Sequence, residues 1–313
     1  IFLGTPFNLL YNFGSSMLRA VGDTKRPLIY LTISGIINVI INIVTVTVFN
    51  MDVVGVAIAT IFSQAVSAVL VLITLIRSNG FLKLSLRKLK IHKHARIDII
   101  RLGVPTGIQS ALFSITNVFL QSSVNSFGSA VVNGCSISGQ IEGYIYAVVN
   151  SISSTALTVV GQNYGARDYS RIKKTILITN VFVTVATLAI SWLAILFHRP
   201  LCKIFMNGNA SEEETNLIIS YAYQKLIIIG GTYFLDGIME VVTFSLRGVG
   251  YSITSMLIVL VGTCVLRIVW IYCIFPFVHN LSFLFLMYPI SWIVTLGVGI
   301  VFLVVLLRRD EKR

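Results

Sequence analysis

The sequence predicts an all-α integral membrane protein. Of its 313 residues, 56% are hydrophobic and only 12% are charged, and the mean hydropathy is +0.87. An ordinary soluble domain carries about a quarter charged residues, and its core could not cover this much apolar surface. A bilayer can, provided that each segment is a helix of about 20 apolar residues whose backbone groups are bonded internally.

Nine long apolar runs, each bounded by charge, Gly, Pro or Asn, give the expected membrane spans. The first run opens at Ile1 already inside an apolar stretch, with no initiator Met and no basic segment of the kind that begins a signal peptide. We therefore expect it to be the remnant of a longer helix. The nine runs are Ile1–Leu18, Leu28–Phe49, Val53–Ile76, Ile99–Phe127, Ala130–Val160, Ile172–Phe197, Leu217–Leu246, Ile253–Phe277 and Phe283–Leu307.

The positions of Lys and Arg predict the orientation, because short loops rich in these residues stay cytoplasmic. One orientation places 20 of the 24 Lys and Arg residues inside or at that boundary, and it leaves the acidic run Glu212–Glu214 outside. We expect a multi-pass protein of the cell (inner) membrane with a cytoplasmic C-terminus. The segments that would be cytoplasmic are 19–26, 77–101, 167–174, Arg247 and 308–313.

A net charge of +12 could instead indicate nucleic-acid binding. The most basic segment, Leu82–Arg96, lies between two expected spans and alternates Leu with Lys or Arg. That pattern is typical of a short amphipathic connector on anionic headgroups, so we expect the lipid bilayer and not nucleic acid as its partner.

Two segments of the chain are nearly the same. LRAVGDTKRP begins at Leu18 and LRGVGYSITS begins at Leu246, and in both an Arg (Arg19, Arg247) precedes a Gly (Gly22, Gly250) at the expected cytoplasmic end of a helix. Six spans lie between the copies, which predicts a parallel repeat of six-helix units. If the units are equal, about 130 residues, or three helices and part of a fourth, precede Ile1, and nine spans become twelve.

Further motifs accompany the two LRxxG turns in chain order. Together they resemble the multidrug and toxic compound extrusion (MATE) family, with the front of the chain truncated. The further motifs are GVAIATIFSQ (Gly55–Gln64), RLGVPTGIQ (Arg101–Gln109), GQNYGARDYSRI (Gly161–Ile172) and YPISW (Tyr288–Trp292).

The resemblance implies two six-helix bundles, the first incomplete, that face each other across a central cavity. It also implies export of organic, often cationic or amphipathic compounds in exchange for H⁺ or Na⁺ by alternating access. The expected division is 1–77 for the rest of the N-terminal bundle (end of helix 4 to helix 6), 78–97 for a basic cytoplasmic linker, 98–307 for the C-terminal bundle and 308–313 for a cytoplasmic tail. The chain lacks the first three helices, including the first-helix carboxylate that many members use.

Two other functions remain open. A lipid-linked oligosaccharide flippase of the related superfamily shares the two-bundle plan, but it should line its cavity with several Arg or Lys, and only Arg267 lies deep in a predicted span. A non-transporting membrane remnant is the second. An enzyme is not expected, because HExxH, GxSxG, Walker and Rossmann patterns are absent from the sequence.

Ionisable residues inside the spans are the candidate functional residues, because a charge at the bilayer centre costs at least ~2.5 kcal/mol. Asp236 and Glu240 lie four residues apart and share a helix face, so the pair could hold a proton or cede it to Na⁺. Glu142 is a candidate neighbour. Alternatively, Glu240 only neutralises Arg267; Arg247 is on the same stripe but too far along the axis for an easy pair with Glu240.

Three further predictions concern single residues. Lys225 lies nearer the outer boundary and is expected to snorkel to it. Asp236 stands where some MATE members resemble this chain in having a functional carboxylate. Where those members have a seventh-helix carboxylate as well, this chain offers Phe113 and Ser114.

The glycine- and proline-containing motifs point to packing or gating. Gly161 and Gly165 have a small-xxx-small spacing that allows close helix approach, with Gln162 and Asn163 available for hydrogen bonds, although the same residues could simply end a helix. Pro105 can kink its span or sit in its first turns.

The remaining residues of possible chemical interest give no further site. Four scattered Cys and the connector residues His92 and His94 imply neither disulfides nor a metal site. The sequons at Asn209 and Asn280 matter only in a secretory pathway. We expect no cofactor beyond the transported cation, small organic molecules as substrates, and a monomer.

Overall fold

The computed structural model describes residues 2–78, 82–85, 90, 92–206 and 211–311. The chain forms two compact units, Ile1–His92 and Lys93–Arg313, and the division falls inside the expected linker 78–97. Throughout the described ranges, every regular element is a helix. The predicted helical membrane fold is therefore confirmed.

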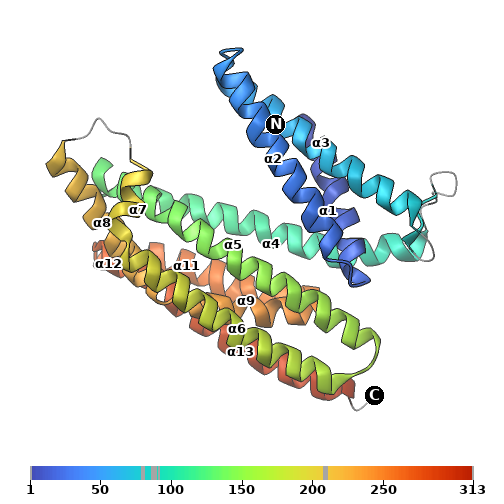
Figure 1. The fold of residues 1–313 in the computed structure, drawn as a ribbon. Helices are drawn as coiled ribbons and strands as arrows, with labels where there is room; N and C mark the ends of the chain where they lie inside the picture. The colour runs from blue at the N-terminus through green and yellow to red at the C-terminus, as the bar shows by residue number, and fades with distance from the viewer. Residues whose placement is uncertain (1, 79–81, 86–89, 91, 207–210, 312–313) are drawn as a thin grey trace. The chain divides into compact units, whose positions relative to one another are not determined.

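The first unit is a group of helices in which α3 is the common neighbour. Helices α2 and α3 lie side by side (Figure 1), and α1 packs against α3. The Ser34 hydroxyl donates to the Ser63 carbonyl at 2.6 Å, so small polar residues set the close approach of α2 and α3. The elements are η1 (Phe2–Gly4), α1 (Thr5–Ala20), α2 (Lys25–Thr47) and α3 (Val53–Arg77).

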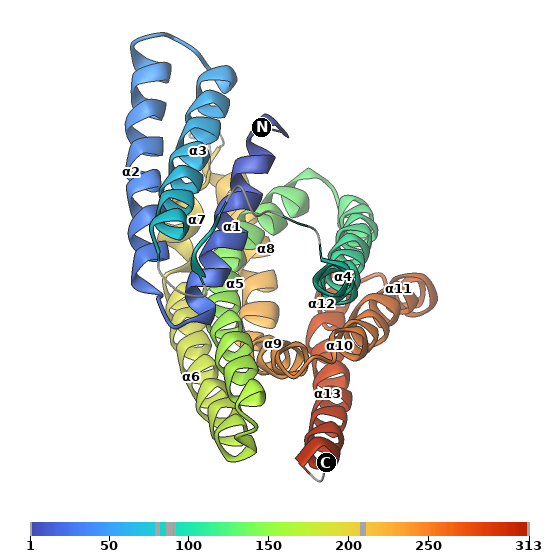
Figure 2. The same ribbon diagram turned by 90° about the vertical axis from the view of Figure 1, so that its right-hand side faces the viewer.

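The second unit is built around α5 and α9. Helix α5 packs against α6, α8 and α9, while α9 also contacts α6 and α13 (Figures 1 and 2). The buried core of this unit includes Ile145, Met239 and Phe285. The elements are α4 (Lys93–Asn125), α5 (Ser129–Gly165), α6 (Tyr169–Leu196), α7 (His198–Ile204), α8 (Glu212–Gly231), α9 (Tyr233–Gly248), α10 (Ser252–Val259), η4 (Leu260–Val265), α11 (Leu266–Val269), η5 (Trp270–Ile274), η6 (Phe275–Phe277), α12 (Leu281–Phe285) and α13 (Met287–Glu311).

Among the residues that the structure describes, six helical segments are long and apolar enough to cross a membrane, and the bent pair α8–α9 would be a seventh if it is one span. The other two of the nine predicted runs form α1 and α4, which do not qualify. Helix α1 has 16 residues, fewer than the ~20 that cross a bilayer, and α4 is long but less apolar. The six segments are Lys25–Thr47, Val53–Arg77, Ser129–Gly165, Tyr169–Leu196, Ser252–Phe277 and Leu281–Glu311.

The predicted run Leu217–Leu246 is not one straight helix. Its two parts, α8 and α9, meet at Thr232 with a bend of 44°. Gly230 and Gly231 have low helix propensity, and the Thr232 hydroxyl bonds back to the Ile228 carbonyl at 2.7 Å. As a consequence, Asp236 lies in the first turn of a new helix.

The two LRxxG segments end their helices in the same way. Gly22 and Gly250 have φ angles of 89° and 88°, in the left-handed region that favours glycine. In each copy the glycine N–H donates to the carbonyl of the Arg (Arg19, Arg247) at 2.9 Å, and the next N–H reaches the carbonyl of the preceding Leu. The local backbone of the sequence repeat is therefore shared.

The GQNYG segment forms the last turn of α5 and also a packing contact. A Cβ on Gly248 of α9 would lie 3.0 Å from the Leu157 carbonyl oxygen and 3.3 Å from the Gly161 nitrogen, so α5 and α9 approach closely here. The cap after α5 repeats the LRxxG geometry, but the left-handed residue is Arg167, with φ 58°. Asn163 donates to the Val159 carbonyl at 2.8 Å.

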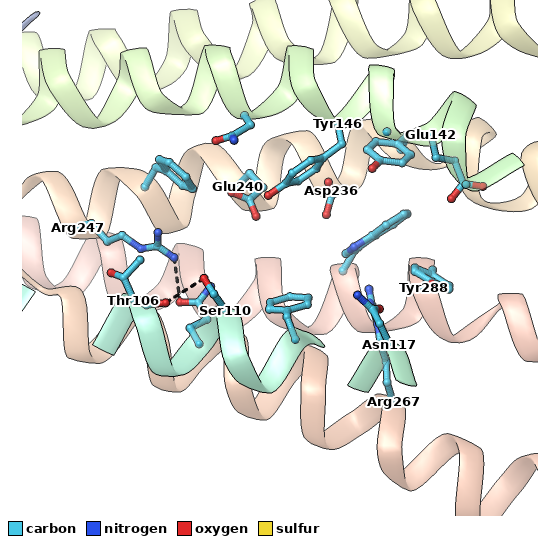
Figure 3. A pocket seen from close by; sticks show the side chains of 18 residues that line it. Thr106, Ser110, Asn117, Glu142, Tyr146, Asp236, Glu240, Arg247, Arg267 and Tyr288 are labelled. Carbon is cyan, nitrogen blue, oxygen red and sulfur yellow. Dashed lines mark hydrogen bonds between the residues drawn. The ribbon is translucent and has the colours of Figure 1, made fainter. Parts of the chain in front are cut away.

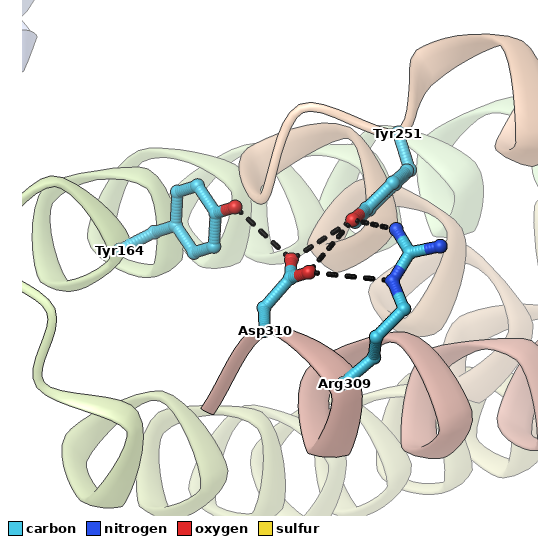
Figure 4. Close-up of polar contacts among 4 residues, drawn as sticks. All are labelled: Tyr164, Tyr251, Arg309 and Asp310. Atoms are coloured by element: carbon cyan, nitrogen blue, oxygen red, sulfur yellow. Dashed lines mark hydrogen bonds and ion pairs between the residues drawn. The ribbon is translucent and has the colours of Figure 1, made fainter. Parts of the chain in front are cut away.

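A polar cluster holds the last turn of α13 (Figure 4). The Tyr164 hydroxyl donates to Asp310 Oδ2 at 3.0 Å, and the Tyr251 hydroxyl donates to the same oxygen at 2.9 Å. Arg309 donates to the Tyr251 hydroxyl, and Asp310 is only 9% exposed. The cluster joins the end of α5 and the start of α10 to α13.

Candidate functional site

A cavity of about 580 Å³ lies within the second unit (Figure 3). Its walls come from α4, α5, α9, α11 and α13, and they combine aromatic rings with charged side chains. Its size is that of a site for a drug-sized molecule. The lining residues are Thr106, Gln109, Ser110, Phe113, Asn117, Gly139, Glu142, Gly143, Tyr146, Asn150, Tyr233, Asp236, Glu240, Phe244, Arg247, Arg267, Tyr288 and Trp292.

Asp236 and Glu240 project from the same face of α9 into this cavity (Figure 3). Asp236 is 7% exposed, and within the described part of the chain it makes neither a hydrogen bond nor an ion pair. Glu240 Oε2 is buried and likewise has no hydrogen-bond partner among those residues. The two carboxylates therefore make no direct polar contact with the described protein. Arg267 acts on Asp236 and Arg247 acts on Glu240 only through space, at a place where burial makes a charge costly.

Glu142 is in a different situation, although it lines the same cavity. Its Oε2 lies 3.3 Å from Lys225 Nζ, and its Oε1 accepts from the Ser138 hydroxyl at 2.7 Å. Lys225 Nζ also donates to the Cys135 carbonyl at 3.2 Å. Glu142 is thus held in a buried ion pair between α5 and α8.

The prediction that Lys225 snorkels to the membrane boundary is wrong. Lys225 is only 9% exposed, because its ammonium turns to Glu142 and the Cys135 carbonyl instead of leading outward. A position along the helix does not reveal a carboxylate on a neighbouring helix, and such a partner removes the reason to snorkel.

Arg247 ties three helices together at one end of the cavity. Its guanidinium donates to Gln109 Oε1 of α4 at 2.9 Å and to the Ser255 hydroxyl of α10 at 3.3 Å. It also lies 4.7 Å from the centre of the Phe244 ring. No ion pair joins Arg247 to Glu240 in the described structure, as their separation along the helix leads one to expect.

Arg267 reaches the cavity from α11, which lies between two π-helical turns, Leu260–Val265 and Trp270–Ile274. Its Nε donates to the Ser291 hydroxyl at 3.1 Å, and its guanidinium carbon lies 4.2 Å from the centre of the Tyr288 ring. An ion pair of Arg267 with Glu240, the competing structural hypothesis, does not form in the described part of the chain.

The other predicted residues lie outside the charged part of the cavity. Helix α4 continues through Pro105, and Phe113 lines the cavity wall. Ser114 bonds within its own helix to the Ser110 carbonyl. Arg19 belongs to the first unit, where its Nε donates to the Ser15 carbonyl at 3.4 Å.

A metal site is not formed by His, Cys, Asp and Glu within the described ranges, where no group of three or more comes together. All four Cys are free thiols. His94 is in α4, but its side chain lies outside the described part of the structure, as does the sequon residue Asn209.

Sequence reasoning missed several cavity residues. Tyr146 projects from α5 beside the two α9 carboxylates (Figure 3), and Gln109 anchors Arg247. Gln109 was recognisable as part of RLGVPTGIQ, whereas Tyr146 and Trp292 carry no local signal that separates a cavity aromatic from a core aromatic.

Comparisons with known proteins agree with this architecture. A family model described as MatE matches residues 105–273, more than half of the chain. The probable multidrug resistance protein YoeA of Bacillus subtilis is 26% identical over 258 residues, which are 80% of this chain and 54% of that protein. The multidrug export protein MepA of Staphylococcus aureus (strain N315) is 21% identical over 274 residues, 87% of this chain and 58% of that protein.

Solved structures show the same fold at low identity. The outward-facing conformation of a multidrug resistance MATE family transporter of the MOP superfamily has a TM-score of 0.86 at 18% identity, covering 97% of this chain and 67% of that one. A MOP superfamily transporter from Pyrococcus furiosus, described as having reverse polarity of its binding pocket, has a TM-score of 0.89 at 20% identity, with the same coverage. The chain spans about half the length of the curated relatives that it matches.

Proposed function

The chain belongs to the MATE family, and we propose that the full-length protein is a secondary active exporter that exchanges H⁺ or Na⁺ for organic, cationic or amphipathic compounds. The observation that carries this proposal is the pair Asp236 and Glu240, two carboxylates that make no hydrogen bond or ion pair with the described residues and line a drug-sized cavity of a membrane protein. In the complete protein, the helices of the first unit would form part of the N-terminal bundle.

If the coupling cation and the exported compound cannot bind to these carboxylates at the same time, the inward flow of the cation is coupled to the outward flow of the compound. A carboxylate without a partner inside a membrane is costly, so it favours any state in which a cation neutralises it. A proton or Na⁺ and an organic cation compete for the same negative charge, and the uptake of one then releases the other. Alternating exposure of the cavity to the two sides converts that competition into exchange.

The proposal is tested by accumulation of ethidium in cells that express the full-length protein. We expect lower accumulation than in control cells and loss of this difference when an ionophore dissipates the ion gradients. Asp236→Asn and Glu240→Gln should each abolish the efflux at unchanged membrane expression. Efflux that survives the ionophore and follows ATP instead, or full transport by both variants and their double mutant, contradicts the coupling site.

Export of a lipid-linked oligosaccharide is the second candidate, because Arg247 lines the cavity together with Arg267, where the sequence indicated Arg267 alone. However, Gln109 and Ser255 already occupy the Arg247 guanidinium. One available guanidinium is a weak match for a pyrophosphate, so drug export is favoured. A membrane protein without transport activity would fail both the ethidium assay and a lipid-flipping assay.

We expect the exporter to work as a monomer in the cell membrane, with the tail after α13 in the cytoplasm and without a nucleic-acid partner. Reporter fusions to the loops around Gly128 and Arg167 would measure the orientation. We expect alkaline phosphatase activity at Gly128 and none at Arg167, and the opposite result would contradict the proposed orientation.

A further inference from the structure

The charges of the cavity are balanced but lie on different walls. When both are ionised, Asp236 and Glu240 contribute two negative charges on α9, while Lys225 offsets Glu142. Arg247 and Arg267 carry two positive charges, one at the end of α9 and one on α11. A purely cationic ligand would complement the carboxylates only, and it would leave a buried positive charge beside its body.

Arg267 is the group that such a ligand would leave without a countercharge, because Asp236 is the carboxylate that acts on it through space. It is 4% exposed, and only its Nε is bonded, to the Ser291 hydroxyl. Among the described residues, no carbonyl, hydroxyl or carboxylate accepts from its two terminal nitrogens, although the side chain lines the cavity (Figure 3). The four terminal N–H donors of Arg267 therefore open into the cavity without an acceptor from the described protein, and an acceptor on a ligand that reaches them would be stabilised.

The surroundings of Arg267 also fix its orientation. The Tyr288 ring lies against one face of the guanidinium, with 4.2 Å between the Arg267 carbon and the ring centre, and Ser291 holds Nε one turn farther along α13. The planar edge made by the terminal nitrogens is therefore presented as a fork. A fork of two parallel N–H groups matches a carboxylate better than any other common group of a small organic molecule.

We infer that Arg267 binds an anionic group, in particular a carboxylate, of the transported compound, and that the cavity prefers amphoteric aromatic molecules over their purely cationic analogues. The cationic end of such a molecule lies at Asp236 and Glu240, and its rings pack against Tyr146 and Trp292. The inference deepens the proposed export function and rests on it.

Two dyes that differ in one group test the preference. Rhodamine 123 is the methyl ester of rhodamine 110, so they share a cationic ring system and only rhodamine 110 has a free carboxylate. Fluorescence anisotropy would measure the binding of each dye to the purified full-length protein. We expect rhodamine 110 to bind at least ~10-fold more tightly, the usual size of one charge-assisted contact.

The variant Arg267→Gln should remove this preference by weakening rhodamine 110 at least ~10-fold while leaving rhodamine 123 unchanged or tighter. Arg247→Gln is the matched control, because it removes the same charge from the same cavity but at a guanidinium that is already bonded. It should leave the ratio of the two dissociation constants unchanged. Arg267→Lys keeps the charge without the fork and should fall between wild type and Arg267→Gln.

Several results would overturn the inference. One is that the wild-type protein binds rhodamine 110 no more tightly than rhodamine 123. This result does not depend on the folding of any variant. Another is an equal loss of both dyes in Arg267→Gln, which would make Arg267 a structural residue only. Gradient-driven efflux of rhodamine 123 reports the proposed function separately: efflux without a dye preference refutes the Arg267 subsite alone, and a preference without gradient-driven efflux refutes the coupling.

Discussion

The three acidic side chains that line the cavity differ in their contacts with the rest of the protein. Glu142 has a lysine, a hydroxyl and no free oxygen, whereas Asp236 and Glu240 have no ion pair within the described chain. The difference shows that this bundle can neutralise a buried carboxylate when its role is structural. The α9 carboxylates have no such contact with the described residues, and they are therefore the ones that we propose for cation coupling.

The helices explain how the two arrangements arise. Glu142 and Lys225 face each other across the packed α5–α8 contact, where two charges can meet at 3.3 Å. Asp236 follows the bend at Thr232, and it faces the cavity instead of a neighbouring helix. The break in the span thus separates Lys225 of α8, which pairs with Glu142 of α5, from the two α9 carboxylates, which face the cavity without an ion pair to any described residue.

The largest effect on stability is expected from Lys225→Met. The substitution leaves Glu142 buried without its cation, which should lower the free energy of unfolding by about 3–5 kcal/mol. Thermal unfolding of the purified full-length protein would measure the loss. The double mutant Glu142→Gln/Lys225→Met should recover most of it, and a double mutant no more stable than the single one would show that the ion pair is not the cause.

A smaller loss is expected from Gly248→Ala, which affects the helices that carry all three carboxylates. Its Cβ would lie 3.0 Å from the Leu157 carbonyl oxygen and 3.1 Å from Val160 Cγ1, so α5 and α9 must separate, at a cost of about 1–3 kcal/mol. Gly161→Ala is the matched control in the facing helix. Its Cβ would meet the Gly248 oxygen at an ordinary 3.5 Å, so an equal loss in both variants would argue against a steric cause.

Asp236→Asn and Glu240→Gln should have the opposite sign to Lys225→Met. Each removes a buried acidic group that makes no hydrogen bond or ion pair with the described residues, so the free energy of unfolding should stay the same or rise by up to about 1 kcal/mol while efflux is lost. Thermal unfolding and ethidium efflux on the same preparation would separate the two effects. A marked loss of stability would place these carboxylates with Glu142 as structural groups.

The smallest effect is expected at Arg167, in the cap that follows α5. The left-handed backbone of Arg167 costs about 1–2 kcal/mol, because the residue has a Cβ. Replacing Arg167 with glycine removes that cost, but the greater flexibility of glycine in the unfolded chain cancels about 0.5–1 kcal/mol of the stabilisation. Arg167→Gly should therefore stabilise by less than about 1 kcal/mol. Gly250→Ala, at the equivalent position of the next cap, should destabilise; a loss in both variants would contradict the cap argument.

Features set by spacing along one helix could be predicted from the sequence. The four-residue interval brings Asp236 and Glu240 to one face, the seven-residue interval keeps Arg247 from pairing with Glu240, and the LRxxG repeat gives two matching caps. The helical membrane fold followed from the composition and the apolar runs, and the family resemblance from motifs in chain order.

Features that depend on a neighbouring helix could not. The sequence around Lys225 does not predict Glu142 as its partner, and the sequence around Arg267 does not predict Ser291. Each contact is made only when two distant helices pack together. The π-helical turns beside Arg267 have no sequence signal as simple as a proline. The bend at Thr232 did have one, two glycines before a threonine, but tertiary packing decides whether such a site breaks.

The Asp310 cluster can form only late in synthesis of the chain. Tyr164 and its acceptor are 146 residues apart in the chain. At ~5–20 residues per second, a ribosome needs roughly 10–30 s to make that interval, so the end of α5 is complete long before its carboxylate exists. Until then water must satisfy both tyrosine hydroxyls, and the final helix closes the unit in one late step.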